Sequence, residues 1–151
     1  MKTLKIGNVS IEGPLVLGPM AGVTDTVYRQ LCKEQGCHLL YTEMVSAKAI
    51  LYKNKNTHPL LSACDTERPL ALQLFGSEPD IMAEIASQIE NGPYDIIDVN
   101  MGCPVPKIVN NNEGSALMKN PRLVGEIIGA MTKKNKKPVT LKIRKGFSEN
   151  D

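Results

Sequence analysis

The chain has 151 residues, of which 42% are hydrophobic, and its formal net charge is +2 at pH 7. This length and composition are typical of one globular domain and exclude a disordered polar chain. No apolar stretch is long enough to span a bilayer, and the N-terminus lacks the apolar core of a signal peptide. We therefore expect a cytoplasmic protein that does not associate with membranes.

The four cysteines and two histidines form no metal-binding pattern. The cysteines include no C-x-x-C pair, and neither histidine has a partner at helical spacing, so we expect neither a metal site nor a disulfide framework. Basic residues gather near the C-terminus, over 133–145. Such a run is usually a solvated helix end, and the alternative is a surface that binds phosphate groups.

The first apolar run, PLVLGPM at 14–20, predicts a strand. The segment 24–36 that follows has helical spacing, with Gly36 as its stop. The second run, HLLYTEM at 38–44, predicts the next strand, and a shorter helical pattern covers 46–54.

The third run, PLALQLF at 69–75, predicts another strand. A helix is expected over 77–92, with Ser77 as its cap and Pro79 in its first turn. The fourth run, YDIIDVN at 94–100, predicts the strand after it.

A long loop is expected over 101–119, after the fourth strand. The next helical pattern covers 120–137, where Asn120 provides the start signal and lysines lie at the end. The fifth run, PVTLKIR at 138–144, predicts the last strand.

Strict alternation of strands and helices predicts a parallel sheet with right-handed crossovers. No G-x-G-x-x-G follows the first apolar run, so the dinucleotide-binding open sheet lacks its main signature. We therefore predict an α/β fold that forms the N-terminal part, about five βα units, of a TIM (β/α)8 barrel.

Side-chain parity separates two faces in each predicted strand. One face is aliphatic, and the other becomes polar toward the carboxyl end of the strand. Gln73, Asn100 and Lys142 lie on the polar faces near strand ends, with Glu43 and Arg144 as further candidates. Because barrel enzymes place their chemistry at this mouth, these residues are the candidate site.

Cys103 lies in the run N-M-G-C-P, where Pro104 restricts the backbone to an extended shape. No histidine follows Cys103 in the chain, so a papain-like nucleophile is disfavoured. A thiol can also act as a general acid that protonates a carbanion formed by hydride addition. A small buried hydrophobic residue is the alternative reading of a lone cysteine.

Five segments, in order along nearly the whole chain, resemble the bacterial tRNA-dihydrouridine synthases, most closely their DusB-like branch. The segments are LGPMAGVTDTVYR at 17–29, TEMVSAKAI at 42–50, LQLFGSEPD at 72–80, DVNMGCPVPKIVNNNEGSALMKNP at 98–121 and VTLKIRKGF at 139–147. The N-M-G-C-P run is the most specific of them, because other flavin barrels share the general plan but not this run.

The resemblance implies an FMN-dependent oxidoreductase that takes hydride from NADPH, or NADH, and reduces a uridine in tRNA to 5,6-dihydrouridine. It implies that Asn100 contacts the target uracil and that Cys103 is the acid that protonates C5 after hydride reaches C6. Its flavin-binding positions match five residues of this chain: Pro19, Met20, Ala21, Gln73 and Lys142.

Members of that family continue with further barrel strands and a helical RNA-binding domain. We therefore expect residues 1–151 to be a partial FMN-binding catalytic domain that binds FMN poorly and is inactive alone. Two other functions remain open. One is an FMN barrel that acts on a free pyrimidine, as dihydroorotate dehydrogenase does. The other is a non-catalytic half-barrel whose open edge needs a partner.

Overall fold

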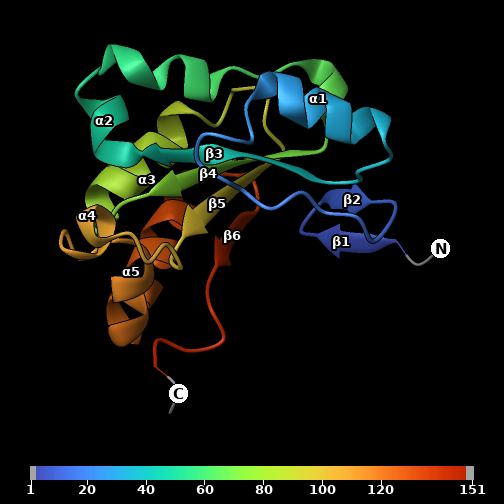
Figure 1. The fold of residues 1–151 in the computed structure, drawn as a ribbon. Helices are drawn as coiled ribbons and strands as arrows, with labels where there is room; N and C mark the ends of the chain where they lie inside the picture. Colours follow the sequence, from blue (N-terminus) through green and yellow to red (C-terminus); the bar gives the residue numbers. More distant parts are fainter. Residues whose placement is uncertain (1–2, 149–151) are drawn as a thin grey trace.

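The computed structural model describes residues 3–148, in which helices flank a parallel sheet (Figure 1). The strands are β1 (Leu4–Ile6), β2 (Val9–Ile11), β3 (Leu40–Ser46), β4 (Leu70–Phe75), β5 (Ile96–Asn100) and β6 (Val139–Lys142). The α-helices are α1 (Thr26–Glu34), α2 (Ala47–Leu51), α3 (Pro79–Gln88), α4 (Pro106–Val109) and α5 (Pro121–Lys134). Short 3-10 helices are η1 (Lys55–Thr57), η2 (Pro59–Leu61), η3 (Asp65–Glu67) and η4 (Gly114–Lys119).

The main sheet has four parallel strands in the order β3-β4-β5-β6. Each strand follows its neighbour in sequence, and α2, α3 or α5 lies in each connection, as the predicted alternation requires. The strands predicted over 38–44, 69–75, 94–100 and 138–144 are confirmed, with ends shifted by about two residues, the usual uncertainty of a strand boundary.

The strand predicted over 14–20 is wrong as a full strand. The segment forms a single parallel bridge, between Val16 and Leu39. Pro14 and Pro19 have no N–H group to donate to a ladder, and in residues 3–148 the segment pairs only with the strand on one side. One-sided pairing between two prolines is too short to build a strand.

An N-terminal hairpin, β1 with β2, was not anticipated by the sequence analysis. The two strands pair antiparallel across a two-residue turn in which Gly7 has φ +58°. The Gly7-Asn8 dipeptide was the available signal. Figure 1 draws this hairpin at the opposite end of the sheet from α4.

The helix predictions are confirmed apart from one cap. Asn120 caps α5, because its side chain accepts a hydrogen bond from the N–H of Leu123 at 3.1 Å. Ser77 does not cap α3. The helix begins at Pro79, and the residue before a proline is held extended, so Glu78 occupies the cap position.

The loop expected over 101–119 contains the two short helices α4 and η4. Pro106 opens α4, where its fixed φ suits a first helical turn. Ile108 and Leu117 are buried and anchor the segment. The segment after β5 is therefore ordered by its own apolar side chains.

The predicted two faces are confirmed for β4 and β5. The outer face packs with α3 and α5 in one core cluster that includes Leu72, Leu74, Ile97 and Val99. The inner face begins with a smaller cluster of Ile11, Leu39, Ala71 and Ile96, which lies at the amino ends of the strands. The β1–β2 hairpin therefore covers the base of the inner face.

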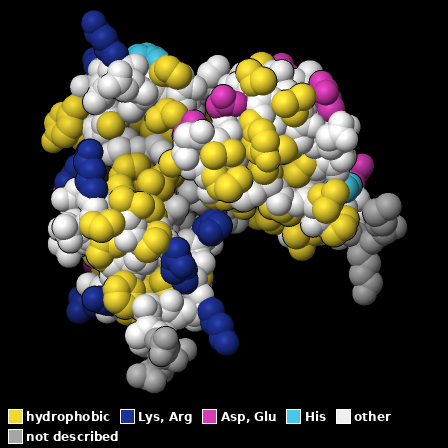
Figure 2. All heavy atoms as spheres, viewed as in Figure 1, with side chains coloured by type: hydrophobic (Ala, Val, Ile, Leu, Met, Phe, Trp, Pro, Cys, Tyr) yellow, Lys and Arg dark blue, Asp and Glu magenta, His cyan; other side chains and the backbone are white. Residues whose placement is uncertain are grey.

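Exposed apolar side chains lie on α1 and just after β6, outside the two central strands of the sheet. Val27 and Leu31 of α1 are 67% and 53% exposed, and Ile143 after β6 is 55% exposed. Figure 2 shows hydrophobic side chains gathered in groups on the surface of one face. In residues 3–148, no helix is long and apolar enough to cross a membrane.

Candidate active site

The polar candidates lie on adjacent strands at the carboxyl end of the sheet. In the parallel register, Gln73 of β4 is opposite Asp98 of β5, and Asn100 of β5 is opposite Lys142 of β6. Opposite residues in a sheet point to the same face. The structure therefore brings Gln73, Asn100 and Lys142 together, as their parity predicts.

A chain of hydrogen bonds joins the buried side chains of β4 and β5. The Nε2 atom of Gln73 donates to Oδ2 of Asp98 at 2.7 Å. The Nδ2 atom of Asn100 donates to Oε1 of Gln73 at 2.9 Å. All three side chains are buried, with exposures of 0%, 1% and 8% for Gln73, Asp98 and Asn100.

The same chain continues into the loop that carries Cys103. The Oδ1 atom of Asn100 accepts the backbone N–H of Cys103 at 2.9 Å and that of Gly102 at 3.3 Å. Arg144 donates from Nε to the carbonyl of Gly102 at 2.6 Å. Cys103 is half-buried, and these hydrogen bonds hold its backbone in place.

Gly114 supports this loop and was missed by the sequence analysis. A Cβ atom at Gly114 would lie 2.6 Å from the carbonyl oxygen of Cys103, and the residue has φ +60°. The next residue, Ser115, donates its N–H to the same carbonyl at 2.9 Å. Only glycine has both the required backbone angle and the required space.

Glu43 does not follow the regular alternation predicted for β3. A β-bulge between Tyr41 and Met44 makes Met44, rather than Glu43, the partner of Gln73. The hydroxyl of Thr42 fills the gap, because it accepts the N–H of Gln73 at 3.1 Å. A bulge re-aims a side chain, and here the carboxylate of Glu43 accepts the N–H of Gly22.

Pro19, Met20 and Ala21 lie in the loop before α1. The carbonyl of Met20 accepts the backbone N–H of Thr24 at 3.0 Å, and Met20 is 44% exposed. The bond from Gly22 to Glu43 attaches this loop to β3. The described residues include no hydrogen bond from the loop to Gln73, Asn100 or Cys103, so the loop adjoins the strands without joining their network.

Asp98 and Thr140 are polar residues of the inner face that were not selected from the sequence. The Thr140 hydroxyl donates to Oδ1 of Asp98 at 2.5 Å. Burial raises the pKa of Asp98, while the hydrogen bonds from Gln73 and Thr140 and the charge of Lys142 act in the opposite direction. Both residues share strand parity with a chosen neighbour, Asn100 or Lys142, which was the available signal.

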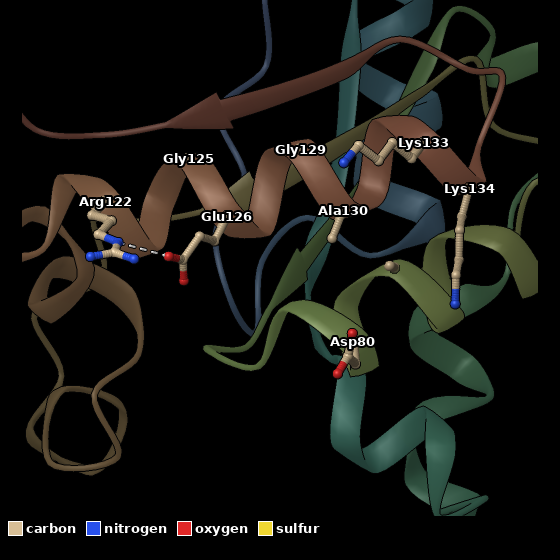
Figure 3. A pocket seen from close by; sticks show the side chains of 9 residues that line it. Asp80, Arg122, Gly125, Glu126, Gly129, Ala130, Lys133 and Lys134 are labelled. Carbon is tan, nitrogen blue, oxygen red and sulfur yellow. Dashed lines mark hydrogen bonds and ion pairs between the residues drawn. The ribbon is translucent and has the colours of Figure 1, made fainter.

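A groove of about 540 Å³ lies elsewhere, between α3 and α5 on the outer layer (Figure 3). Glycine and alanine line much of its α5 wall, and Arg122 pairs with Glu126 at 3.0 Å. Its charged lining residues are Asp80, Arg122, Glu126, Lys133 and Lys134. In residues 3–148, no group of three or more metal-ligating side chains is found, here or at the strand ends.

Comparisons with known proteins agree with the resemblance noted in the sequence. Residues 16–151 match the family model described as dihydrouridine synthase. The tRNA-dihydrouridine synthase B of Pseudomonas aeruginosa is 37% identical over 151 residues, which is 100% of this chain and 46% of that protein. The tRNA-dihydrouridine synthase B of Vibrio parahaemolyticus is 38% identical over 98% of this chain and 46% of its own length.

A probable tRNA-dihydrouridine synthase of Rickettsia bellii is likewise 38% identical over 97% of this chain and 45% of its own length. The chain thus spans about half the length of the curated relatives it matches, and corresponds to their N-terminal part. The predicted fold, a part of a TIM barrel, is confirmed by the family match together with the parallel sheet. The chain belongs to the dihydrouridine synthase family.

Proposed function

We propose that this chain supplies the catalytic thiol and part of the flavin site of an enzyme that reduces uridine in tRNA to 5,6-dihydrouridine. The observation that carries the proposal is the hydrogen bond from the Cys103 N–H to Asn100, which holds a thiol at the mouth beside a buried amide. The family match and the names of the relatives support the same activity.

The residues at the strand ends fit the polar edge of an FMN ring. Gln73 gives one amide hydrogen to Asp98, and the other has no acceptor in residues 3–148; because the side chain is buried, the residues that cover it must move for a ring to reach that hydrogen. Lys142 is exposed at the rim, and the ion pairs of the described residues do not include it. When bound, FMN supplies the hydride-transfer chemistry that side chains lack.

We assign Gln73 and Lys142 as donors to the acceptor atoms of that ring, and the backbone of Pro19, Met20 and Ala21 as the wall beside it. A lysine cation stabilises negative charge that develops on a ring oxygen or nitrogen. NADPH, or NADH, is the proposed source of the reducing equivalents.

Asn100 is the proposed contact to the target uracil. Its Oδ1 atom is engaged by Gly102 and Cys103, and one Nδ2 hydrogen is engaged by Gln73. The remaining Nδ2 hydrogen is a donor, which suits a uracil carbonyl oxygen. Asn100 therefore orients a carbonyl-bearing ring next to the thiol.

Cys103 is the proposed general acid. Its Sγ–H bond breaks as a C–H bond forms at C5 of the uracil, after hydride has reached C6, and the thiolate is then reprotonated from solvent. A positioned acid contributes about 10²- to 10⁴-fold to a rate. The half-buried position of Cys103 suits this role, because the thiol can approach a bound base and still exchange protons with water.

We further propose that residues 1–151 form a partial catalytic domain and that tRNA is its macromolecular partner in the cytoplasm. The rest of the barrel and a helical tRNA-binding domain would come from the part of the relatives that this chain does not span. A base must leave its stack to reach the thiol. The binding of tRNA also needs basic contacts to its phosphates. Because the phosphate end of the flavin site would also come from that part, we expect FMN binding by residues 1–151 alone to be weak.

The test is a chimera in which residues 1–151 are joined to the unmatched remainder of the Pseudomonas aeruginosa relative. We expect it to copurify with FMN and to form dihydrouridine in unmodified tRNA with NADPH, as measured by mass spectrometry of the digested nucleosides. Cys103→Ala should keep the flavin absorbance and lose turnover by about 10²- to 10⁴-fold.

Cys64→Ala is the matched control, because Cys64 precedes η3 and contacts Gln30 rather than the site. Its turnover should equal that of the unaltered chimera. Unchanged turnover in Cys103→Ala would remove this residue from the acid role. Reduction of free pyrimidines with no reaction on tRNA would replace the proposed function with that of a free-pyrimidine reductase.

A further inference from the structure

Asp98 is a buried carboxylate whose contacts are not explained by strand packing. It is 1% exposed and lies in the middle of β5, where an apolar residue would cost less to bury. Its two oxygens accept from different strands, Oδ2 from Gln73 of β4 and Oδ1 from Thr140 of β6. A carboxylate that is buried at such a cost calls for a role beyond filling space.

Asp98 determines the direction of the hydrogen bonds that follow it in the network. An ionised carboxylate can only accept, so it draws the Nε2 end of Gln73 toward itself. The Oε1 end of Gln73 then faces Asn100 and must receive its Nδ2 group. Each amide has one donor end and one acceptor end, so the orientation of the first amide sets that of the second.

The second amide in turn sets the thiol loop. With its Nδ2 group turned to Gln73, Asn100 presents Oδ1 to the backbone N–H groups of Gly102 and Cys103. A reversed Asn100 would place its own N–H groups against those two donors, and the loop would lose both bonds. The Cys103 backbone is therefore correctly held only while the upstream amides keep this direction.

We propose that Asp98 is a positioning residue that fixes the orientation of Gln73 and, through Asn100, the placement of the Cys103 loop. This role rests on the proposed function, because the placement of the loop affects catalysis only if Cys103 is the acid. Asp98 itself touches neither thiol nor loop in the described hydrogen bonds. Its effect is relayed through two amides over three links.

The test uses amide hydrogen exchange of the 151-residue chain, followed residue by residue by NMR. The reporters are the N–H groups of Gly102 and Cys103, and the reference is the N–H of Ile97, which bonds to Pro138 in the same sheet at 3.0 Å. A general loss of stability raises exchange at all of them. Loss of the relay raises exchange at the reporters relative to the reference.

The decisive variants are Asp98→Asn, Thr140→Val and their combination. Asn at 98 can still accept from Gln73 if the Thr140 hydroxyl turns to accept from its amide, and Val at 140 leaves the carboxylate in place. Each single variant should therefore raise relative exchange of Gly102 and Cys103 by less than about 1.5-fold, well under one net hydrogen bond. The double variant leaves the direction of the amides unfixed, and exchange should rise about five- to tenfold, which corresponds to one net hydrogen bond.

Asn100→Ala should give the largest rise in relative exchange at Gly102 and Cys103, because alanine has no side-chain acceptor for their N–H groups. A double variant whose effect equals the product of the two single effects would overturn the proposal, since independent packing changes combine in that way. Should the double variant not fold, Asp98→Leu offers no acceptor at all and must show the same selective rise. A folded Asp98→Leu with wild-type exchange would overturn the proposal. The experiment uses no flavin or tRNA, so its result does not depend on whether the proposed activity is correct.

Discussion

The two central strands and the two edges of the sheet differ in how completely the protein covers them. Every residue of β4 and β5 except Phe75 is buried. At the edges, Val16 is 48% exposed and Leu141 is 37% exposed. The centre of the sheet, β4 and β5, is therefore covered by the protein, whereas its margins, β6 on one side and the segment beside β3 on the other, are partly exposed to solvent.

The candidate site spans both regions. Gln73 and Asn100 belong to the centre, where a closed hydrogen-bond network orients them. Lys142 and the Pro19–Ala21 loop belong to the margins, where no side-chain network holds them to the centre among the described residues. Preorganisation is therefore uneven, and a ligand that needs all of these groups has to order the marginal ones itself.

The largest expected contrast is in core truncation. Leu72→Ala removes a fully buried side chain from the outer face of β4 and should lower the free energy of unfolding by about 2–5 kcal/mol. Leu141→Ala on β6 should cost less than about 1 kcal/mol, because its side chain is already partly solvated. Urea denaturation followed by circular dichroism measures both. Equal losses would contradict the distinction between centre and margin.

A smaller contrast concerns two glycines. Gly114→Ala should cost about 1–3 kcal/mol and displace the Cys103 loop, because φ is +60° and a Cβ would meet the Cys103 carbonyl. Gly125→Ala, in the interior of α5 with nothing within 4 Å of the new Cβ, should stabilise by about 0.5–1 kcal/mol. Thermal unfolding of the two variants decides the matter, and a stabilised Gly114→Ala would rule out the proposed close contact.

A still smaller effect concerns pH. Burial raises the pKa of Asp98 above its ordinary value of 3.8, so between these two pKa values the folded chain binds more protons than the unfolded chain. The contribution of Asp98 to stability must then fall as pH rises through the interval just above pH 3.8 and stay constant at higher pH. Asp98→Asn lacks this titration.

The measurement is the free energy of unfolding of both proteins across that interval, with the value for wild type subtracted from the value for Asp98→Asn. The difference should increase with pH. A difference that decreases with pH would mean that the folded state lowers the pKa of Asp98, and would reverse the assignment of burial as the dominant cause.

The smallest effect on stability is expected at the margin of the site. Lys142→Met should change the free energy of unfolding by no more than about 0.5 kcal/mol, because the side chain is exposed. In the chimera with the Pseudomonas aeruginosa remainder, the same change should weaken FMN binding, as measured by flavin fluorescence titration. Retained affinity would exclude Lys142 from the flavin site and leave the centre as its main contributor.

Local pattern was sufficient for most of the elements. The alternation of apolar runs and helical patterns predicts β3 to β6 and the helices α2, α3 and α5 between them, because each of these elements has a periodicity and end signals of its own. The 14–20 strand failed for a different reason. Its composition suits a strand, but a strand also needs neighbours, and composition does not report how many neighbours a segment has.

The sequence by itself determined the family, the order of the elements and the positions of Gln73, Asn100 and Cys103 at strand ends, because strand parity and the N-M-G-C-P run are local properties. Only the tertiary structure decided that Asp98 orients the amides and that Gly114 packs against the thiol loop. Both contacts join residues that lie on different segments of the chain, and a hydrogen bond has a direction that residue identity does not encode. For this reason the candidate residues could be named from the sequence, while the link from a buried carboxylate to the thiol loop required the fold.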